Sequence, residues 1–167
     1  MPSIRTVLLL PFLALSSVAL GQAADECRSD YVRPDFAVLE SNLAEARARW
    51  EGAGLKDYRY DFAQFVAPAQ FPLARISVKN AAVTTVEEVE GEVVSSEPLP
   101  EDTGQTMAQR FDEIERGIAA AQKQPCSLFS AKYDADDGHP LQLTNGTALA
   151  GLQDGVGGWE ISEFTPF

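Results

Sequence analysis

The spacing of apolar residues in this chain alternates twice between the period of a helix and the period of a β-strand. Apolar side chains recur at every third or fourth position over residues 36–50 and again over residues 107–118. That spacing places them on one face of an α-helix. Each helical stretch is followed by segments in which apolar and polar residues alternate, as they do in strands that bury one face. The sequence therefore predicts an α+β fold.

Local signals indicate where the two helices begin and end. Asp35 is suited to cap the first helix, and Gly52 or Gly54 is suited to end it. Thr106 and Gln109 form a capping-box pattern, in which the two side chains satisfy backbone N–H groups at the start of the second helix.

Three strands are predicted after each helix. They lie at residues 58–62, 73–78 and 82–89, and at residues 126–133, 140–144 and 159–164. Asn80 and the pair Asn145-Gly146 are expected to form turns, because Asn and Gly tolerate a left-handed backbone. The glycine-rich residues 147–158 are expected to be loose. The predicted architecture is a mainly antiparallel sheet of five to six strands with both amphipathic helices on one face, in the order αβββαβββ.

The periodic faces also predict the core. The residues expected to be buried together are Leu43, Trp50, Tyr60, Ile76, Phe111, Ile114 and Phe129. Trp50 and Trp159, with Tyr58 and Tyr60, could instead line a binding face, but their periodic positions favour core packing.

The first 24 residues have the features of a secretory signal peptide. A basic start at Arg5 precedes an apolar run over residues 6–20, and small residues follow at its end. The run is too short for a comfortable membrane span, which disfavours the alternative of an uncleaved anchor. The protein is then expected to be periplasmic or secreted, with no membrane insertion after cleavage. The expected divisions are a signal peptide at 1–21 (or up to 24), an N-terminal segment at 22–35 and a single α+β domain at 36–167.

Acidic residues are concentrated in the second half of the chain. The formal net charge is −12, and residues 80–167 contain 4 bases and 16 acids. A chain without a basic stripe is not suited to bind nucleic acid or an anionic membrane. A basic protein partner in the envelope is compatible with this charge. The alternative is an acidic, solvated surface that keeps an exported protein soluble.

The chain contains two cysteines, Cys27 and Cys126. In an oxidising compartment an isolated pair usually forms one disulfide. Asp25 and Glu26 argue against lipid attachment at Cys27, and a separation of 99 positions excludes a redox CxxC motif. We therefore expect the two cysteines to be bonded to each other.

Glu88, Glu90 and Glu92 are the candidate interaction residues. Alternate residues of a strand point to the same face, so these three could form one row of like charge. Such a row favours a cationic partner. The alternative is that the charges protect an exposed strand edge from aggregation, which requires no partner.

An acidic loop at residues 134–138 resembles the start of a calcium-binding loop. An EF-hand needs a glycine at its sixth position and a bidentate acid at its twelfth, but this loop has His139 and Asn145 there. Two interpretations stay open: an ordinary acidic β-turn, or a looser calcium site whose ligands are Asp134, Asp136 and Asp137.

Three motifs occur in order along the chain: Trp50-x-x-x-Gly54-Leu55-x-Asp57-Tyr58-x-Tyr60, Met107-x-x-x-Phe111-Asp112-x-Ile114 and Tyr133-Asp134-x-x-x-Gly138-x-Pro140. Together they resemble a family of bacterial exported proteins that is known only as a domain of unknown function. The resemblance covers about residues 50–167 and implies a periplasmic or secreted α+β domain. It implies no activity, so no functional residue is carried over.

A non-enzymatic binding or interaction module of the cell envelope is the hypothesis that fits these observations best. His139 is the only histidine and has no nucleophile pattern beside it, so it is expected to be a surface turn residue. Two alternatives stay open: a small hydrolase or lyase that uses carboxylates, and a calcium-binding or envelope-structural protein. No cofactor is expected.

The first prediction concerns processing. The exported chain should begin between Gln22 and Asp25, because only that region offers small residues after the apolar run. Intact-mass measurement of the exported protein gives the answer directly. A retained Met1 or a lipid-modified Cys27 would contradict it.

Overall fold

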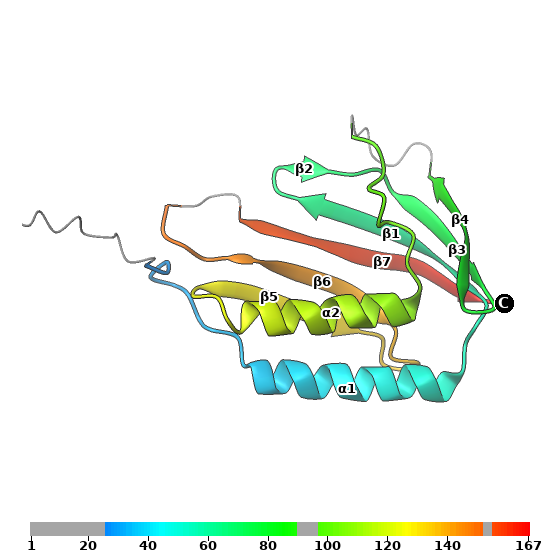
Figure 1. The fold of residues 1–167 in the computed structure, drawn as a ribbon, viewed down its shortest axis with the longest axis horizontal. Helices are drawn as coiled ribbons and strands as arrows, with labels where there is room; N and C mark the ends of the chain where they lie inside the picture. The colour runs from blue at the N-terminus through cyan, green and yellow to red at the C-terminus, as the bar shows by residue number, and fades with distance from the viewer. Residues whose placement is uncertain (1–25, 90–96, 152–154) are drawn as a thin grey trace, which may run out of the picture.

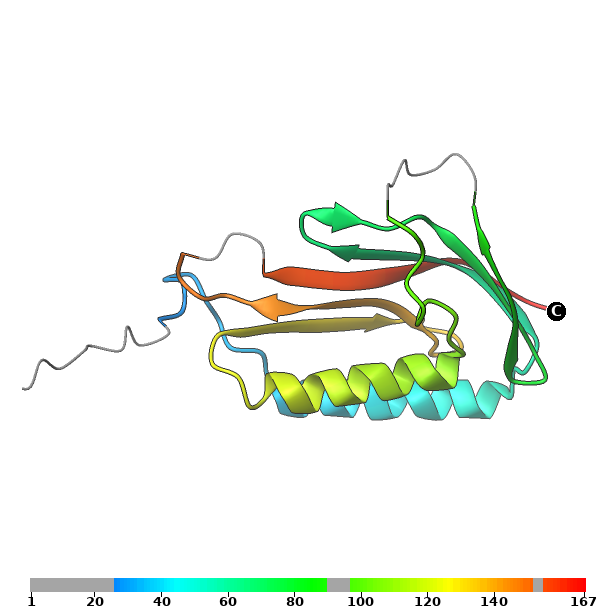
Figure 2. The same cartoon turned by 45° about the horizontal axis from the view of Figure 1, so that its top comes forward.

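Two helices lie side by side on one face of a seven-stranded antiparallel sheet in the computed structural model of the protein (Figures 1 and 2). The structure describes residues 26–89, 97–151 and 155–167. The signal peptide expected within residues 1–24 lies outside these ranges. No helix in the described part of the chain is both long and apolar enough to cross a membrane.

The helices have the expected caps. Helix α1 spans Phe36–Ala53; Asp35 accepts a bond from Val38 N at 3.2 Å. Gly54 ends the helix with a left-handed φ of 64°, a conformation that glycine adopts without steric penalty. Helix α2 spans Met107–Ala121 and has the predicted reciprocal capping box at its start.

The strands form two antiparallel meanders that are joined in the middle of the sheet. Their order across the sheet is β4-β3-β1-β7-β6-β5, and the short β2 pairs with β1. The pairing of β1 with β7 therefore joins the first meander, β1-β3-β4, to the second, β5-β6-β7. The strands are β1 Tyr58–Val66, β2 Ala69–Gln70, β3 Ala74–Lys79, β4 Ala82–Glu88, β5 Ser127–Tyr133, β6 Pro140–Thr147 and β7 Val156–Pro166.

The fold class is as predicted, but the strand count and order differ. The sheet has seven strands because β1 continues to Val66 and turns back as the two-residue strand β2. Four strands therefore follow α1, where three were expected. Two exposed residues are too few to show an alternating pattern, so the sequence contained no signal for β2.

The glycine-rich region also differs from expectation. Asn145 and Gly146 are paired residues inside β6, and β7 begins already at Val156. The glycines are needed here for close approach of neighbouring backbones: a Cβ on Gly158 would lie 2.1 Å from the carbonyl oxygen of Leu143. The expected turn at Asn145-Gly146 is therefore wrong, and the expected loose segment is partly strand; these glycines allow tight packing of β6 against β7.

The helices cover one face of the sheet, which we call the helix face, and the opposite side is the outer face. Tyr58, Tyr60 and Phe62 of β1 point to the helix face and are buried there. All seven predicted core residues belong to the same buried cluster, as do both tryptophans. Trp50 contacts Tyr58 edge-on, with ring centroids 5.3 Å apart. The interpretation of these aromatic residues as core is confirmed.

A strap at residues 26–35 ties the start of the described chain to the ends of α2 and the second meander. Cys27 and Cys126 form the expected disulfide, with Cα atoms 5.2 Å apart. Arg33 donates to the carbonyl of Gln122 at 2.7 Å, which satisfies an acceptor at the end of α2. The two cysteines are 99 positions apart. In the chain-entropy description of disulfides, closing a loop of this length in the unfolded chain adds about 4–5 kcal/mol to the free energy of unfolding.

A buried charged network lies at the first turns of α2. The guanidinium of Arg110 stacks on the ring of Phe62, 3.8 Å from its centroid, and Nη1 donates to Glu113 at 2.8 Å. Nη2 donates to the carbonyl of Thr103 at 2.7 Å. The other oxygen of Glu113 accepts a bond from the indole of Trp159 at 2.9 Å. The charge of Arg110 is thus balanced by a hydrogen-bonded partner, as buried charges require.

Two tyrosines on the helix face share this environment. The hydroxyl of Tyr58 accepts a bond from Met107 N at 2.8 Å, and that of Tyr60 donates to the carbonyl of Gln105. Burial raises the pKa of Tyr60 to about 12, although the nearby Arg110 opposes this shift. A third tyrosine, Tyr133 at the end of β5, also has its pKa raised by burial to about 12.

Replacing Phe111 by Ala should lower the free energy of unfolding by about 3–5 kcal/mol, the usual cost of emptying a buried aromatic site. Phe111 is fully buried between α2 and the sheet. Urea unfolding measures the loss, and Arg116→Ala on the exposed side of α2 should stay within about 0.5 kcal/mol of the parent. A loss under about 1 kcal/mol for Phe111→Ala would contradict the packing of α2.

The protein should lose stability as the pH rises from about 10 to about 12. An unfolded tyrosine ionises near pH 10, whereas Tyr60 and Tyr133 hold their protons to about 12 in the fold. The stabilisation is therefore complete below pH 10 and is lost through this window. Tyr60 alone should account for about 2–3 kcal/mol of the loss. Urea unfolding at each pH measures the free energy of unfolding, and tyrosinate absorbance measures the ionisation of the tyrosines. Ionisation of Tyr60 near pH 10 in the intact fold would contradict the prediction.

Candidate functional site

Glu88, the first of the three candidate glutamates, is the last residue of β4 and is exposed. Glu90 and Glu92 lie outside the described residues, so the expected row of three is seen only at its first member. Glu87 is also exposed but points to the other face. The register shows this, because Glu87 is opposite Arg75 of β3 and Glu88 is opposite Ala74.

Strand β4 is an edge strand of the sheet. Within the described part of the chain it is hydrogen-bonded to β3 on one side and to no strand on the other. Six of its seven residues are exposed, whereas β3 has three buried residues among six. An edge strand presents unpaired backbone N–H and C=O groups, which is the general requirement for pairing with another chain.

The outer face carries a row of alternating charges that ends at β4. Asp61 is 3% exposed, and Arg75 donates to both of its carboxylate oxygens, at 2.7 and 2.6 Å. Arg75 is in turn opposite Glu87 in the register of β3 and β4. The hydrogen bonds to Asp61 raise the pKa of Arg75, and the charges of Glu163 and Glu87 act in the same direction. The side-chain charge therefore alternates along this row, from negative at Asp61 to positive at Arg75 and negative at Glu87.

A connector at residues 97–106, which leads to the start of α2 (Figure 2), contains further acids. It approaches β4 closely at Gly104, where a Cβ would lie 2.6 Å from Cγ2 of Val86. We call β4 and this connector the acidic edge. Its described acids are Glu87, Glu88, Glu97, Glu101 and Asp102.

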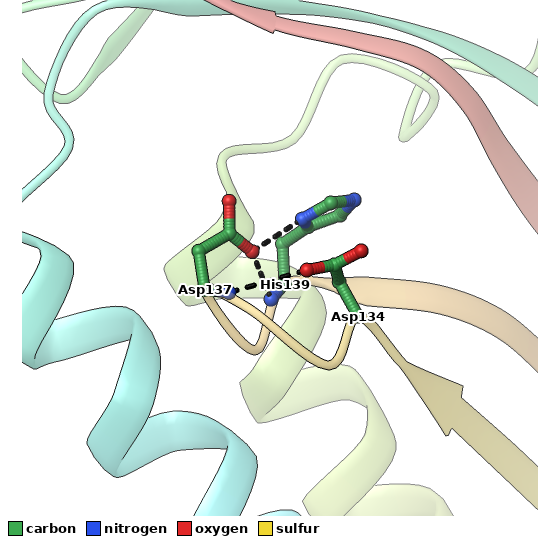
Figure 3. A group of neighbouring side chains, drawn as sticks. All are labelled: Asp134, Asp137 and His139. Atoms are coloured by element: carbon green, nitrogen blue, oxygen red, sulfur yellow. Dashed lines mark hydrogen bonds and ion pairs between the residues drawn. The ribbon is translucent and has the colours of Figure 1, made fainter.

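The acidic loop between β5 and β6 brings Asp134 and Asp137 together with His139 (Figure 3). One potential ligand atom from each residue lies within 4.8 Å of the others. Asp136 is exposed and is not a member of this group. The structure thus assembles two of the three proposed calcium ligands and adds the imidazole.

The oxygens of this loop already serve as hydrogen-bond acceptors. Asp134 Oδ1 accepts the backbone N–H groups of Asp136 and Asp137, at 2.8 and 3.1 Å. Asp137 Oδ1 accepts the backbone N–H of His139 and lies 2.5 Å from its ring Nδ1. Burial raises the pKa of Asp134, but these backbone donors and the charges of His139 and Arg49 outweigh it and lower the pKa. The arrangement orders the turn, as Asp side chains commonly do.

The expectation that His139 is a surface residue is wrong. His139 is 5% exposed, and its ring stacks on Phe164 with centroids 4.1 Å apart. The loop is pressed against α1, because a Cβ on Gly138 would lie 2.2 Å from the carbonyl oxygen of Ala46. Glycine permits this approach because it has no Cβ, and it also adopts the positive φ of this position without strain. Nothing in the sequence pattern near His139 indicates that a distant helix covers it.

Two charged pairs, Asp61 with Arg75 on neighbouring strands and Arg110 with Glu113 on α2, are not among the sequence predictions. The second pair was visible as residues three apart on a helix, which are neighbours on its surface. The first pair needs the register of two strands, which single-sequence patterns do not specify.

The motif residues have structural roles. Gly54 ends α1, and Asp57 Oδ1 accepts the backbone N–H of Asn80 at 2.6 Å, which ties the start of β1 to the β3–β4 turn. Asn80 and Ala81 both have positive φ in that turn, as predicted for Asn80. Trp50, Tyr58 and Tyr60 are core residues.

Comparison with known protein families matches residues 42–163 to one family, described as "Family of unknown function (DUF6174)". The matched range includes α2 and β1 to β6 completely, and it includes α1 and β7 in part. No curated protein and no solved structure matches the chain. Because the family match covers most of the sequence, this protein belongs to the Family of unknown function (DUF6174).

Proposed function

We propose that this protein is an exported, non-enzymatic module of the cell envelope that binds a basic protein through its acidic edge. The observation that carries the proposal is the concentration of acids on β4 and the connector. No base occurs between Lys79 and Arg110, and Glu87 and Glu88 are exposed on an edge strand.

Export is supported by two independent features of the chain. The first 24 residues have the order of basic, apolar and small residues that defines a secretory signal. The disulfide between Cys27 and Cys126 suits an oxidising compartment such as the periplasm or the exterior.

The physical effect of the acidic edge is long-range attraction of a cationic partner. Like charges on neighbouring segments repel one another in the free protein, and a basic surface relieves that repulsion on binding. Exposed charges act mainly on the association rate and are screened by salt. Binding through this edge is therefore expected to be salt-sensitive.

Reversal of Glu87 and Glu88 to Lys should abolish capture of basic envelope proteins by the immobilised protein. The change replaces two negative charges at the proposed surface by two positive ones, which repel the partner. Capture from an envelope fraction is quantified by mass spectrometry, and the captured proteins should carry net positive charge. In about 1 M salt, where the screening length falls to about 3 Å, the parent protein should lose them as well.

The matched control is reversal of Glu45 and Glu51, two exposed acids of α1, to Lys. It changes the net charge by the same amount at a different surface and should leave capture unchanged. Equal loss in both variants would mean that net charge alone attracts the partner. That result, or capture that survives the reversal on β4, would overturn the proposal.

A further inference from the structure

We propose that β4 takes its partner as an added antiparallel strand with the sequence pattern basic, basic, apolar, polar. This inference rests on the proposed function, because it specifies how the acidic edge would engage a basic protein. Addition of a strand to a free sheet edge is a common mode of peptide recognition, in which main-chain bonds give affinity and alternate side chains give specificity.

The backbone of β4 is available for such pairing. In the ranges that the structure describes, β3 is its only strand neighbour. A bulge at Thr84 interrupts the regular register, and residues 85–88 follow it without interruption. Bulges are among the features that protect edges, so the four residues after it are the part of β4 that remains suited to pairing.

The charges on the outer face determine which residue of the incoming strand fits opposite Glu87. The cross-strand row there runs Asp61, Arg75, Glu87, with alternating sign. Opposite charges on directly opposed residues stabilise a sheet, and like charges destabilise it. A cation opposite Glu87 continues the alternation by one strand. Thr85 ends the neighbouring row on the same face, where a polar residue fits.

The helix face determines which residues of the incoming strand fit opposite Val86 and Glu88. The row Tyr60, Ile76, Val86 is apolar and ends at Val86, which is 40% exposed. An apolar residue on the incoming strand would cover this side chain. Glu88 ends the next row after Ala74, so a second cation fits opposite it.

The antiparallel direction converts these positions into a sequence. An incoming strand meets Glu88 first, then Glu87, Val86 and Thr85, which requires basic, basic, apolar and polar residues in that order. Two copies of β4 paired with each other would place glutamates against glutamates or leave them without a cation. The same charges therefore disfavour self-pairing while they favour a basic strand.

The opposite edge of the sheet does not fit the same partner. Strand β5 is the other terminal strand, and its exposed charged side chain is Lys132. Helix α1 also packs beside β5, where Asn42, Glu45 and Arg49 share a groove with Ala131 and Tyr133. A basic strand would meet a like charge there. The proposal is therefore specific to β4.

The test uses a blocked, fluorescently labelled peptide that contains Lys-Arg-Val-Thr between threonine flanks, with a scrambled peptide of equal composition as its control. Binding is measured by fluorescence anisotropy, and amide hydrogen exchange of the protein is followed with and without peptide. The ordered peptide should bind at least about tenfold more tightly than the scrambled one. The β4 amides that point away from β3 should exchange more slowly in the complex.

A charge swap distinguishes register-specific pairing from general attraction. Glu87→Lys should weaken binding roughly tenfold, and a peptide with Glu in place of its Arg should recover most of this loss. The matched control is Glu160→Lys, which reverses an exposed acid of β7 and should leave binding of the ordered peptide within about twofold. Failure of the swapped peptide to bind Glu87→Lys better than the original peptide does would overturn the proposed register.

The outcomes separate this inference from the proposed function. If envelope capture depends on Glu87 and Glu88 but the peptide leaves β4 amide exchange unchanged, strand addition is wrong and the basic partner binds in another way. Equal affinity for ordered and scrambled peptides would also refute strand addition. If capture itself does not depend on these glutamates, the proposed function fails, and slower β4 exchange with the ordered peptide would still support an open pairing edge.

Discussion

The pairing of β1 with β7 is the interaction on which the rest of this structure depends. These strands join a meander formed after α1 to a meander formed after α2, and their register runs from Tyr58 opposite Pro166 to Val66 opposite Gly157. Without it, the molecule would consist of two small sheets, each with an extra edge and a half-covered apolar face. Because β1 and β7 lie in the middle, β4 and β5 are the two ends of the strand order, and the proposed binding surface follows from that order.

Much of the fold could be predicted because local signals agreed with the tertiary arrangement. Asp35, Gly54 and Thr106 mark helix ends through their own backbone preferences, and the structure uses them in those roles. The core residues were identifiable because burial on one face imposes a period on the sequence. The two cysteines were predictable as a pair because a chain with only two cysteines offers a single intramolecular disulfide.

The errors arose where a residue's role depends on a distant segment. His139 is buried because α1 and Phe164 cover its loop, and neither contact leaves a trace next to His139 in the sequence. Gly146 and Gly158 suggested flexible turns, but they let adjacent strands approach closely. The alternating row Asp61, Arg75 and Glu87 depends on strand register, which a single sequence does not specify. The candidate site was thus predictable in composition and not in geometry.

The N-terminal strap adds a feature that is separable from the fold it stabilises. Residues 26–35 contribute no member of the buried core cluster, and Cys27 lies before the range that matches the family. The strap therefore stabilises the fold from outside the buried core, through the disulfide and through hydrogen bonds such as that from Tyr31 to the carbonyl of Ser127. The cross-link therefore adds resistance to unfolding at one end of the chain, and it involves no residue of β4.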